Sequence, residues 1–180
     1  MSKAFAVISA IGTDRVGIVD EISGFVTDSG GNVEESKMAV LGGDFSVMML
    51  VSMDSKSLEA LPARIKEVES KLGLKIGITP TGQAASRADG RPYKLETVSL
   101  DGRGILHAVG AILHRHGINI EQLETSTEGA PLTGAPLFSL KASIILGPGI
   151  HVAALRRELE ELEEARELDI SLSPILPGRE

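Results

Sequence analysis

The sequence contains no cysteine and no tryptophan, and aromatic residues make up only 3% of its 180 residues. The lack of cysteine excludes a disulfide framework, a thiol nucleophile and a thiolate metal site. The aromatic side chains are too sparse for the base-stacking platforms that bind single-stranded nucleic acid. Several classes of small protein are thus ruled out before any motif is considered.

Long apolar runs are also missing. No stretch approaches the roughly 20 apolar residues that a membrane-spanning helix requires, and residues 1–5 do not begin the apolar segment of a signal peptide. The hydrophobic fraction of 42% and the mean hydropathy of +0.12 are typical of a folded protein. We therefore expect a cytoplasmic protein that does not bind membranes.

Positive charge is scarce. The chain has 18 Lys and Arg residues against 25 Asp and Glu residues, which gives a formal net charge of −7 at pH 7. Binding to nucleic acid independently of sequence needs Lys and Arg residues that displace phosphate counterions, and the basic residues here are scattered along the chain. We expect no direct contact with nucleic acid.

What the chain does contain is a repeat. Residues 12–19 (GTDRVGIV) recur as residues 99–106 (SLDGRGIL), and residues 29–34 (SGGNVE) recur as residues 116–121 (HGINIE). The same offset of 87 residues relates both pairs of segments, so no insertion separates them. Two long copies indicate two similar domains and not a solenoid. Domains this small bury a modest share of their surface, so we expect them to pack on each other or on a second chain, for example in a homodimer.

Both copies predict the order strand–helix–strand–strand–helix–strand, from apolar alternation for strands and spacings of three and four for helices. In the first copy, strands are expected at residues 4–11, 32–41, 45–51 and 74–78, and helix faces at Val16, Val19, Ile22, Phe25 and Val26 and at Leu58, Leu61, Ile65, Val68 and Leu72. In the second copy, strands are expected at residues 93–100, around 123–125, at 138–146 and at 168–172, and helix faces at Ile105, Leu106, Val109, Ile112 and Leu113 and at Val152, Leu155, Leu159 and Leu162.

Local signals refine this pattern. Thr13 or Asp14 is expected to cap the first helix, and Pro62 is expected to delay or kink the second. Residues 79–92 are rich in Gly and Pro without apolar periodicity, so the predicted domains are residues 1–79 and 93–180, joined by a linker at 80–92.

This order of elements predicts an α+β fold. Right-handed crossovers place both helices on one face of a four-stranded antiparallel sheet, which is the ferredoxin-like arrangement. The strand after the first helix then lies at the sheet edge, and its polar content suits that position. A second sheet could pair with such an edge.

The loop before the first helix of each copy is one candidate binding site. The backbone N–H groups at a helix N-terminus favour a carboxylate or phosphate. Gly17 and Gly104 would allow a ligand to approach closely, and Asp14 and Asp101 could contact its ammonium group. A simpler interpretation makes each Asp a helix N-cap and each Gly a packing contact.

Asn32 and Asn119 form the second candidate, one residue beyond each helix-terminating turn. An amide can donate to a carboxylate and accept from an amine, although Asn is also common in ordinary turns. Because Asp, Gly and Asn recur together while neighbouring polar residues differ, we favour a small zwitterion held between a helix N-terminus and an edge strand.

No pattern typical of an enzyme is present. His114 and His116 are two apart on a predicted helix and point to different faces, so they do not indicate a shared metal. We find no nucleophile–base pairing, no metal-ligand spacing and no phosphate-binding or dinucleotide-binding fingerprint. We expect no catalytic residue, no cofactor and no metal.

The repeated segments resemble the ACT domain, a small-molecule-sensing module of amino-acid metabolism. The likeness lies in Asp14 to Val19 with Gly31-Asn32-Val33, and in Asp101 to Ile105 with residues 117–120. Two such domains covering nearly the whole chain are similar to the glycine cleavage system transcriptional repressor family. Residues 10–15 and 39–42, followed by Phe45, fit that group, as does the longer second hairpin loop.

The resemblance implies that the two domains pair side by side into an eight-stranded antiparallel sheet with helices on one face. It also implies a small amino-acid ligand between the helix-start loop of one domain and the edge strand of its neighbour. The implied contacts are Asp14, Gly17, Ile18, Asn32, Val33, Asp101, Gly104, Ile105, Asn119 and Ile120. Val16 and Arg103 depart from the family motif, which usually has Pro at this position; Arg103 adds a cation that would favour an anionic ligand.

The function that follows is non-enzymatic. The resemblance implies a regulatory protein that binds a small amino acid and signals to a protein partner, in control of glycine cleavage or transcription. One alternative is a small ferredoxin-like enzyme of the acylphosphatase type, although the loop at residues 12–17 matches its phosphate-binding loop poorly. The other is an interaction module that has lost its ligand.

Overall fold

The computed structural model of the protein describes residues 3–82, 89–100, 102–131 and 133–176. Its backbone forms two compact units, Met1–Ala85 and Ser86–Glu180. Each unit has the element order β-α-β-β-α-β, so the order predicted from the repeat is confirmed twice.

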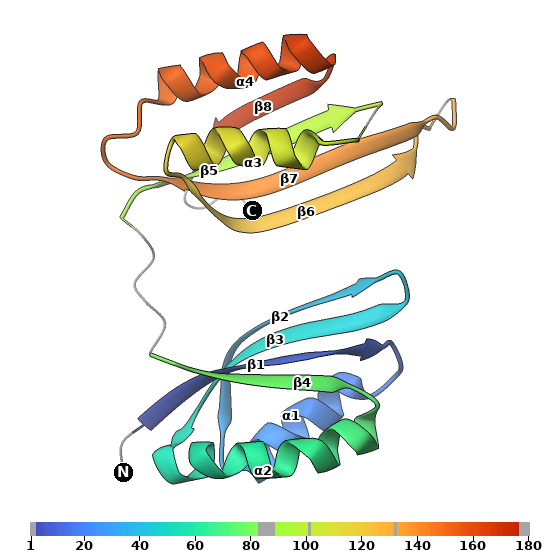
Figure 1. Ribbon diagram of the computed structural model, residues 1–180, viewed down its shortest axis with the longest axis vertical. Coiled ribbons are helices and arrows are strands. Elements are labelled where there is room, and N and C mark those ends of the chain that lie inside the picture. The colour runs from blue at the N-terminus through green and yellow to red at the C-terminus, as the bar shows by residue number, and fades with distance from the viewer. Residues whose placement is uncertain (1–2, 83–88, 101, 132, 177–180) are drawn as a thin grey trace. The chain divides into compact units, whose positions relative to one another are not determined.

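The first unit is a four-stranded antiparallel sheet with two helices on one face (Figure 1). Its strands are β1 (Lys3–Thr13), β2 (Asn32–Leu41), β3 (Asp44–Asp54) and β4 (Lys75–Thr81), and its helices are α1 (Ile18–Asp28) and α2 (Ser55–Leu72). The strand order is β2-β3-β1-β4, so β2 and β4 form the edges, as predicted for the strand after the first helix.

The second unit repeats this arrangement, again with both helices on one face of its sheet (Figure 1). Its strands are β5 (Arg91–Ser99), β6 (Asn119–Gly129), β7 (Pro136–Leu146) and β8 (Asp169–Pro174), and its helices are α3 (Ile105–Arg115) and α4 (Val152–Arg166). The order β6-β7-β5-β8 places β6 at an edge, in the position that β2 has in the first unit.

Each unit has its own hydrophobic core between its sheet and its helices. Alternate residues of the central strands point towards the helices, as a period of two requires; in the first unit they include Ala6, Ile8, Ala10, Phe45, Val47, Met49 and Val51. The predicted α+β, ferredoxin-like fold is thus confirmed for both units. The eight-stranded sheet made from both units stays a prediction.

The opposite sheet faces, which no helix of the same unit covers, differ in chemistry. In the first unit this face carries the exposed apolar side chains of Ile11 and Met48. In the second unit Glu96 pairs in register with Lys141 on this face, and the Lys94 ammonium lies 2.8 Å from the Glu96 carboxylate. At the Met48 position the first face thus exposes an apolar side chain, where the second face carries a charged pair.

The predicted linker at residues 80–92 is longer than the segment between strands. β4 continues to Thr81, because it pairs with β1 as far as the Phe5–Thr81 pair, and β5 begins at Arg91. Both ends of the predicted linker therefore belong to paired strands. Residues 83–88 of the linker lie outside the described part of the chain.

The first helix begins later than predicted. β1 remains paired with β3 as far as Thr13, and Gly17 then adopts a left-handed conformation at the N-cap position without a side-chain cap. Neither Thr13 nor Asp14 caps the helix, so that prediction is wrong. Val16 precedes the helix and is 99% exposed, whereas Ile18 belongs to the core.

The second helix begins before Pro62, and not after it. The Asp54 carboxylate accepts hydrogen bonds from the backbone N–H groups of Lys56 and Ser57, both at 3.1 Å. This N-cap starts α2 at Ser55, and the helix runs through Pro62 to Leu72. The predicted late start is therefore wrong.

A glutamate in the second helix of each unit reaches a backbone N–H of the last strand. The Glu69 carboxylate accepts from the N–H of Ile76 at 2.8 Å, and the Glu163 carboxylate accepts from the N–H of Ile170 at 3.0 Å. Both acceptors stand seven residues before their donors. The repeat thus extends to this contact at the edges formed by β4 and β8.

Candidate functional site

The loop before α1 is held by its backbone. Gly17 has a φ of 92°, and its carbonyl accepts the first intrahelical hydrogen bond, from the N–H of Glu21 at 3.0 Å. The N–H groups of residues 18–20 lie ahead of that bond and have no partner within the helix. A Cβ on Gly17 would have nothing within 4 Å, so this glycine is not a packing contact and the surface beside it is open.

The second unit repeats this geometry. Gly104 has a φ of 71°, and its carbonyl accepts from the N–H of Ala108 at 3.0 Å. A guanidinium crosses the loop, because Arg166 donates to the carbonyl of Arg103 at 3.2 Å. The position of Arg166 near this helix N-terminus was not predicted from the sequence. Asp101, the predicted partner of a ligand ammonium, lies outside the described residues.

Two of the expected contact residues have their side chains in the core. Ile18 is 2% exposed and Ile105 is 1% exposed. Any contribution of these residues to a ligand therefore comes from their backbone N–H groups, which start the helices.

Asp14 is tied to the neighbouring hairpin through its backbone. Its N–H donates to the carbonyl of Gly43 at 3.0 Å, in the tight turn between β2 and β3. Its exposed carboxylate makes no hydrogen bond or ion pair with the described residues. The simpler interpretation of Asp14 as a helix cap is thus wrong, and its side chain is available to a ligand.

An ion pair beside the first helix start was not anticipated. Arg15 donates to the carboxylate of Glu21, with one Nη1–Oε1 distance of 3.3 Å. This hydrogen bond lowers the pKa of Glu21 and raises that of Arg15. The second unit has Gly102 in the equivalent position, so this pair is specific to the first.

Asn32 belongs to a polar cluster at the start of β2. Its amide donates to Glu34 at 3.4 Å, and Glu34 also accepts from the ammonium of Lys3 at 2.9 Å and from the hydroxyl of Ser52. These bonds, above all that from Ser52, lower the pKa of Glu34 to about 2. The sequence analysis missed the role of Glu34, although a glutamate closes the repeated segment in both copies.

Asn119 stands in the equivalent position of β6 without such a cluster. Asn119 pairs in register with Ile145, whereas Asn32 pairs with Ser52. The amide of Asn119 has no hydrogen-bond partner among the described residues. The chain has only these two asparagines, and they occupy matching positions. Val33 and Ile120, which follow them, pack against the cores and offer a ligand only their backbones.

The two groups of candidate residues lie at opposite ends of each unit. Asn32 pairs with Ser52, which pairs with Phe5 near the start of β1, whereas the Asp14 to Gly17 loop follows Thr13 at its end. The eight residue-to-residue steps from Phe5 to Thr13 span about 27 Å at the rise of an antiparallel strand. No single unit therefore brings its loop and its asparagine together around one small molecule.

Comparison with known proteins identifies relatives of this chain. Residues 4–79 match a family model described as the ACT domain. The glycine cleavage system transcriptional repressor of Escherichia coli is 27% identical over 129 residues, which are 72% of this chain and 68% of that protein. Residues 4–79 belong to the ACT domain family.

Solved structures extend the ACT fold to both units. An unknown protein from Galdieria sulphuraria is 35% identical and superposes with a TM-score of 0.80 over 97% of this chain and 100% of that one. A putative glycine cleavage system transcriptional repressor superposes with a TM-score of 0.71 over 97% of this chain and 99% of that one, at 22% identity. The chain is thus a tandem of two ACT domains, related to this repressor family.

Metal-binding clusters and membrane-spanning helices are both absent from the described residues. Within them, no three His, Asp or Glu side chains are grouped to hold a metal ion. No helix in the same part of the tandem ACT chain has the length and apolar character needed to cross a membrane.

Proposed function

We propose that this tandem ACT protein is a non-enzymatic regulator that binds a small amino acid at an interface formed by ACT domains. In the proposal, the helix-start loop comes from one domain and the asparagine from another, in the same chain or in a second copy. The observation that carries it is the separation of about 27 Å between these two groups within a domain, since only an interface would unite them.

The chemistry of the two groups suits a zwitterion. The free N–H groups at residues 18–20 and 105–107 would hold a carboxylate. Asp14 and Asp101 would attract the ammonium group, and the amides of Asn32 and Asn119 can donate to one end and accept from the other.

Regulation would arise because the ligand and the interface depend on each other. A ligand shifts an equilibrium only by its difference in affinity between two arrangements. A site split between two domains binds tightly only when they are paired, so the ligand stabilises that pairing. A protein partner that recognises the paired form would then receive the signal.

The named relatives favour a role in controlling glycine cleavage or its transcription. The net charge of −7 opposes direct binding to DNA. We therefore infer that this cytoplasmic regulator acts through another protein. Acyl-phosphate hydrolysis is disfavoured, because it needs a loop arginine free to hold phosphate and Arg15 is paired with Glu21.

The test is thermal unfolding of the full chain with each standard amino acid, glycine and serine first. A ligand that binds only the folded state adds about 2.7 kcal/mol of stability at a hundred times its Kd. We expect one small amino acid to raise the Tm, and Asn32→Ala with Asn119→Ala to abolish the rise.

The matched control is Gln122→Ala, which removes an exposed amide from β6 without touching either asparagine. It should keep the full shift in Tm. If no amino acid changes the Tm of the unaltered chain, the protein is an interaction module without this ligand. An acyl phosphate that is hydrolysed by the chain would overturn the non-enzymatic assignment.

A further inference from the structure

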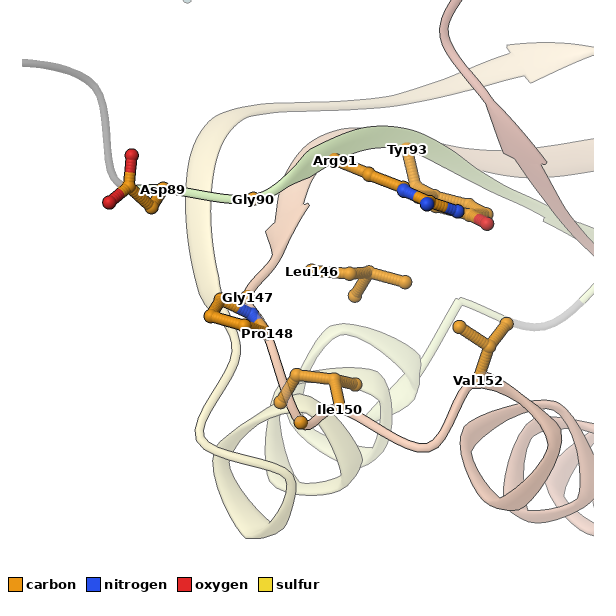
Figure 2. A pocket seen from close by; sticks show the side chains of 10 residues that line it. Asp89, Gly90, Arg91, Tyr93, Leu146, Gly147, Pro148, Ile150 and Val152 are labelled. Carbon is orange, nitrogen blue, oxygen red and sulfur yellow. The ribbon is translucent and has the colours of Figure 1, made fainter.

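The second ACT domain contains a pocket of about 440 Å³ on the helix-covered side of its sheet. It lies between the start of β5 and the connection from β7 to α4, and its lining residues are shown in Figure 2. Small-molecule sites generally measure roughly 300–1,000 Å³. Asn119 pairs with Ile145, whose side chain points to the opposite sheet face from Leu146 in the pocket. The pocket is therefore separate from the proposed amino-acid site.

A local change in sequence opens this pocket. In the first domain, Asp54 caps α2 directly after β3, but Gly147 stands at the equivalent position in the second. The chain then continues through residues 147–151, with Gly149 at a φ of 96°, before α4 begins at Val152. A loop thus replaces the first helical turn and leaves space above Leu146.

The wall formed by β5 carries a cation and a phenol. Arg91 and Tyr93 are two residues apart on one strand, so their side chains share a face, and Figure 2 shows both extending over the pocket. The guanidinium of Arg91 has no hydrogen bond or ion pair among the described residues. Arg91 is therefore available for a planar anion, with which it can form two parallel hydrogen bonds.

The remaining walls are apolar. Leu146, Ile150 and Val152 line the side opposite Arg91 and Tyr93 (Figure 2). The one carboxylate of the lining, that of Asp89, is turned away from this space in the same view. The pocket thus offers a cationic partner for a carboxylate and apolar walls for an aliphatic group, but no carboxylate that faces an ammonium group.

We propose that this pocket binds a small monocarboxylate with a branched aliphatic tail and no ammonium group. The carboxylate lies on Arg91 and Tyr93, and the tail packs on Leu146, Ile150 and Val152. An amino acid with the same tail binds less well, because its ammonium group would lose water without gaining an anionic partner and would lie near the Arg91 cation.

The protein carries its own reporter for this site. Tyr93 is the only tyrosine of a chain without tryptophan, so its fluorescence monitors the pocket directly. Titration of the full chain with 3-methylbutanoate should give a saturable change. Valine, which is 3-methylbutanoate with an ammonium group on the second carbon, and inorganic phosphate, which has no tail, should both bind more weakly.

Two variants separate charge from shape. Arg91→Met should weaken binding of 3-methylbutanoate roughly tenfold or more, the usual effect of losing a hydrogen bond to a charged group. Val152→Phe should weaken it by filling the pocket while the cation remains. The control Arg157→Met removes an exposed arginine from α4 in the same domain and should leave the affinity unchanged.

The outcomes are distinct. The proposal is overturned if 3-methylbutanoate gives no saturable change, if valine binds as tightly, or if Arg91→Met binds like Arg157→Met with both variants folded by circular dichroism. The double variant Asn32→Ala with Asn119→Ala should bind 3-methylbutanoate normally. Failure of the proposed amino-acid site would therefore leave this result intact.

Discussion

The two ACT domains share one fold but expose different sheet faces. In the first domain the uncovered face presents Met48, which is 59% exposed, and in the second the equivalent position is Lys141. Exposed apolar side chains on a sheet face mark an interaction surface only where they form a contiguous patch, and Lys37 pairs in register with Met48. Core positions therefore preserve the backbone, while the uncovered faces differ in chemistry.

What the domains keep in common is equally informative. Each domain has a left-handed glycine before its first helix, Gly17 or Gly104. Each also has an asparagine at the matching position, Asn32 or Asn119. The polar cluster around Glu34 does not recur. The repeated features start helices and edge strands, so they mark the geometry that both domains require.

The largest expected effect comes from matched core deletions. Leu61 and Leu155 are buried at equivalent places in α2 and α4. Changing either to Ala should cost about 2–5 kcal/mol in its own domain, because it leaves a cavity. Urea unfolding followed by amide exchange should show each loss confined to one domain. A uniform loss across both would mean that the domains unfold as one unit.

Two glycine substitutions test the helix-start loop, because they should change the free energy of unfolding in opposite directions. Gly17→Ala places a Cβ at a φ of 92° and should cost ~1 kcal/mol, even though space is open there. Gly24→Ala lies within α1, also with open space, and should gain ~0.5–1 kcal/mol. Chemical unfolding of both variants measures the difference. Equal effects would contradict the role of the left-handed turn.

The polar cluster predicts that Glu34 adds a pH dependence to the stability of the first domain. The pKa of Glu34 is about 2 in the folded state, below its ordinary 4.5. A lowered pKa stabilises the fold above the unfolded value, and this contribution is lost as the pH falls from about 4.5 towards 2. Glu34→Gln should flatten the stability profile in this window. Glu121→Gln, at the equivalent position without the cluster, should leave the profile unchanged.

The smallest effect is expected for exchange of the sheet-face residue. Met48→Lys gives the first domain the side chain of the second and should change the free energy of unfolding by less than ~0.5 kcal/mol if the face is open to water. Thermal unfolding measures it. A loss of several kcal/mol would instead show that another surface covers Met48.

The sequence predicted the fold well because the decisive signals are local and repeated. Apolar alternation in β3 and helical spacing around Phe25 each report on one element, and the offset of 87 residues joins them into two domains. The start of α1 was missed because Val16 continues the apolar spacing, while the pairing of Thr13 with Asp44 depends on a distant strand.

The candidate site was predictable only in part. The glycines and asparagines were visible as repeats, and the edge position of the strands that begin with the asparagines followed from the element order. The left-handed conformation of Gly17 and Gly104 was not predicted. The burial of Ile18 and Ile105 and the bonds to Glu34 depend on how segments pack. The pocket beside Tyr93 was not predicted, since it is built from two segments that lie far apart in the sequence.

The contacts of Glu69 and Glu163 decide which flank of each sheet can accept a new strand. Each carboxylate occupies an outward N–H of the last strand, at Ile76 and at Ile170. A strand that paired with β4 or β8 would have to displace this glutamate side chain. Among the described residues, no glutamate accepts from a backbone N–H of β2 or β6 in this way. We therefore expect any added strand to pair at the flank that begins with the asparagine.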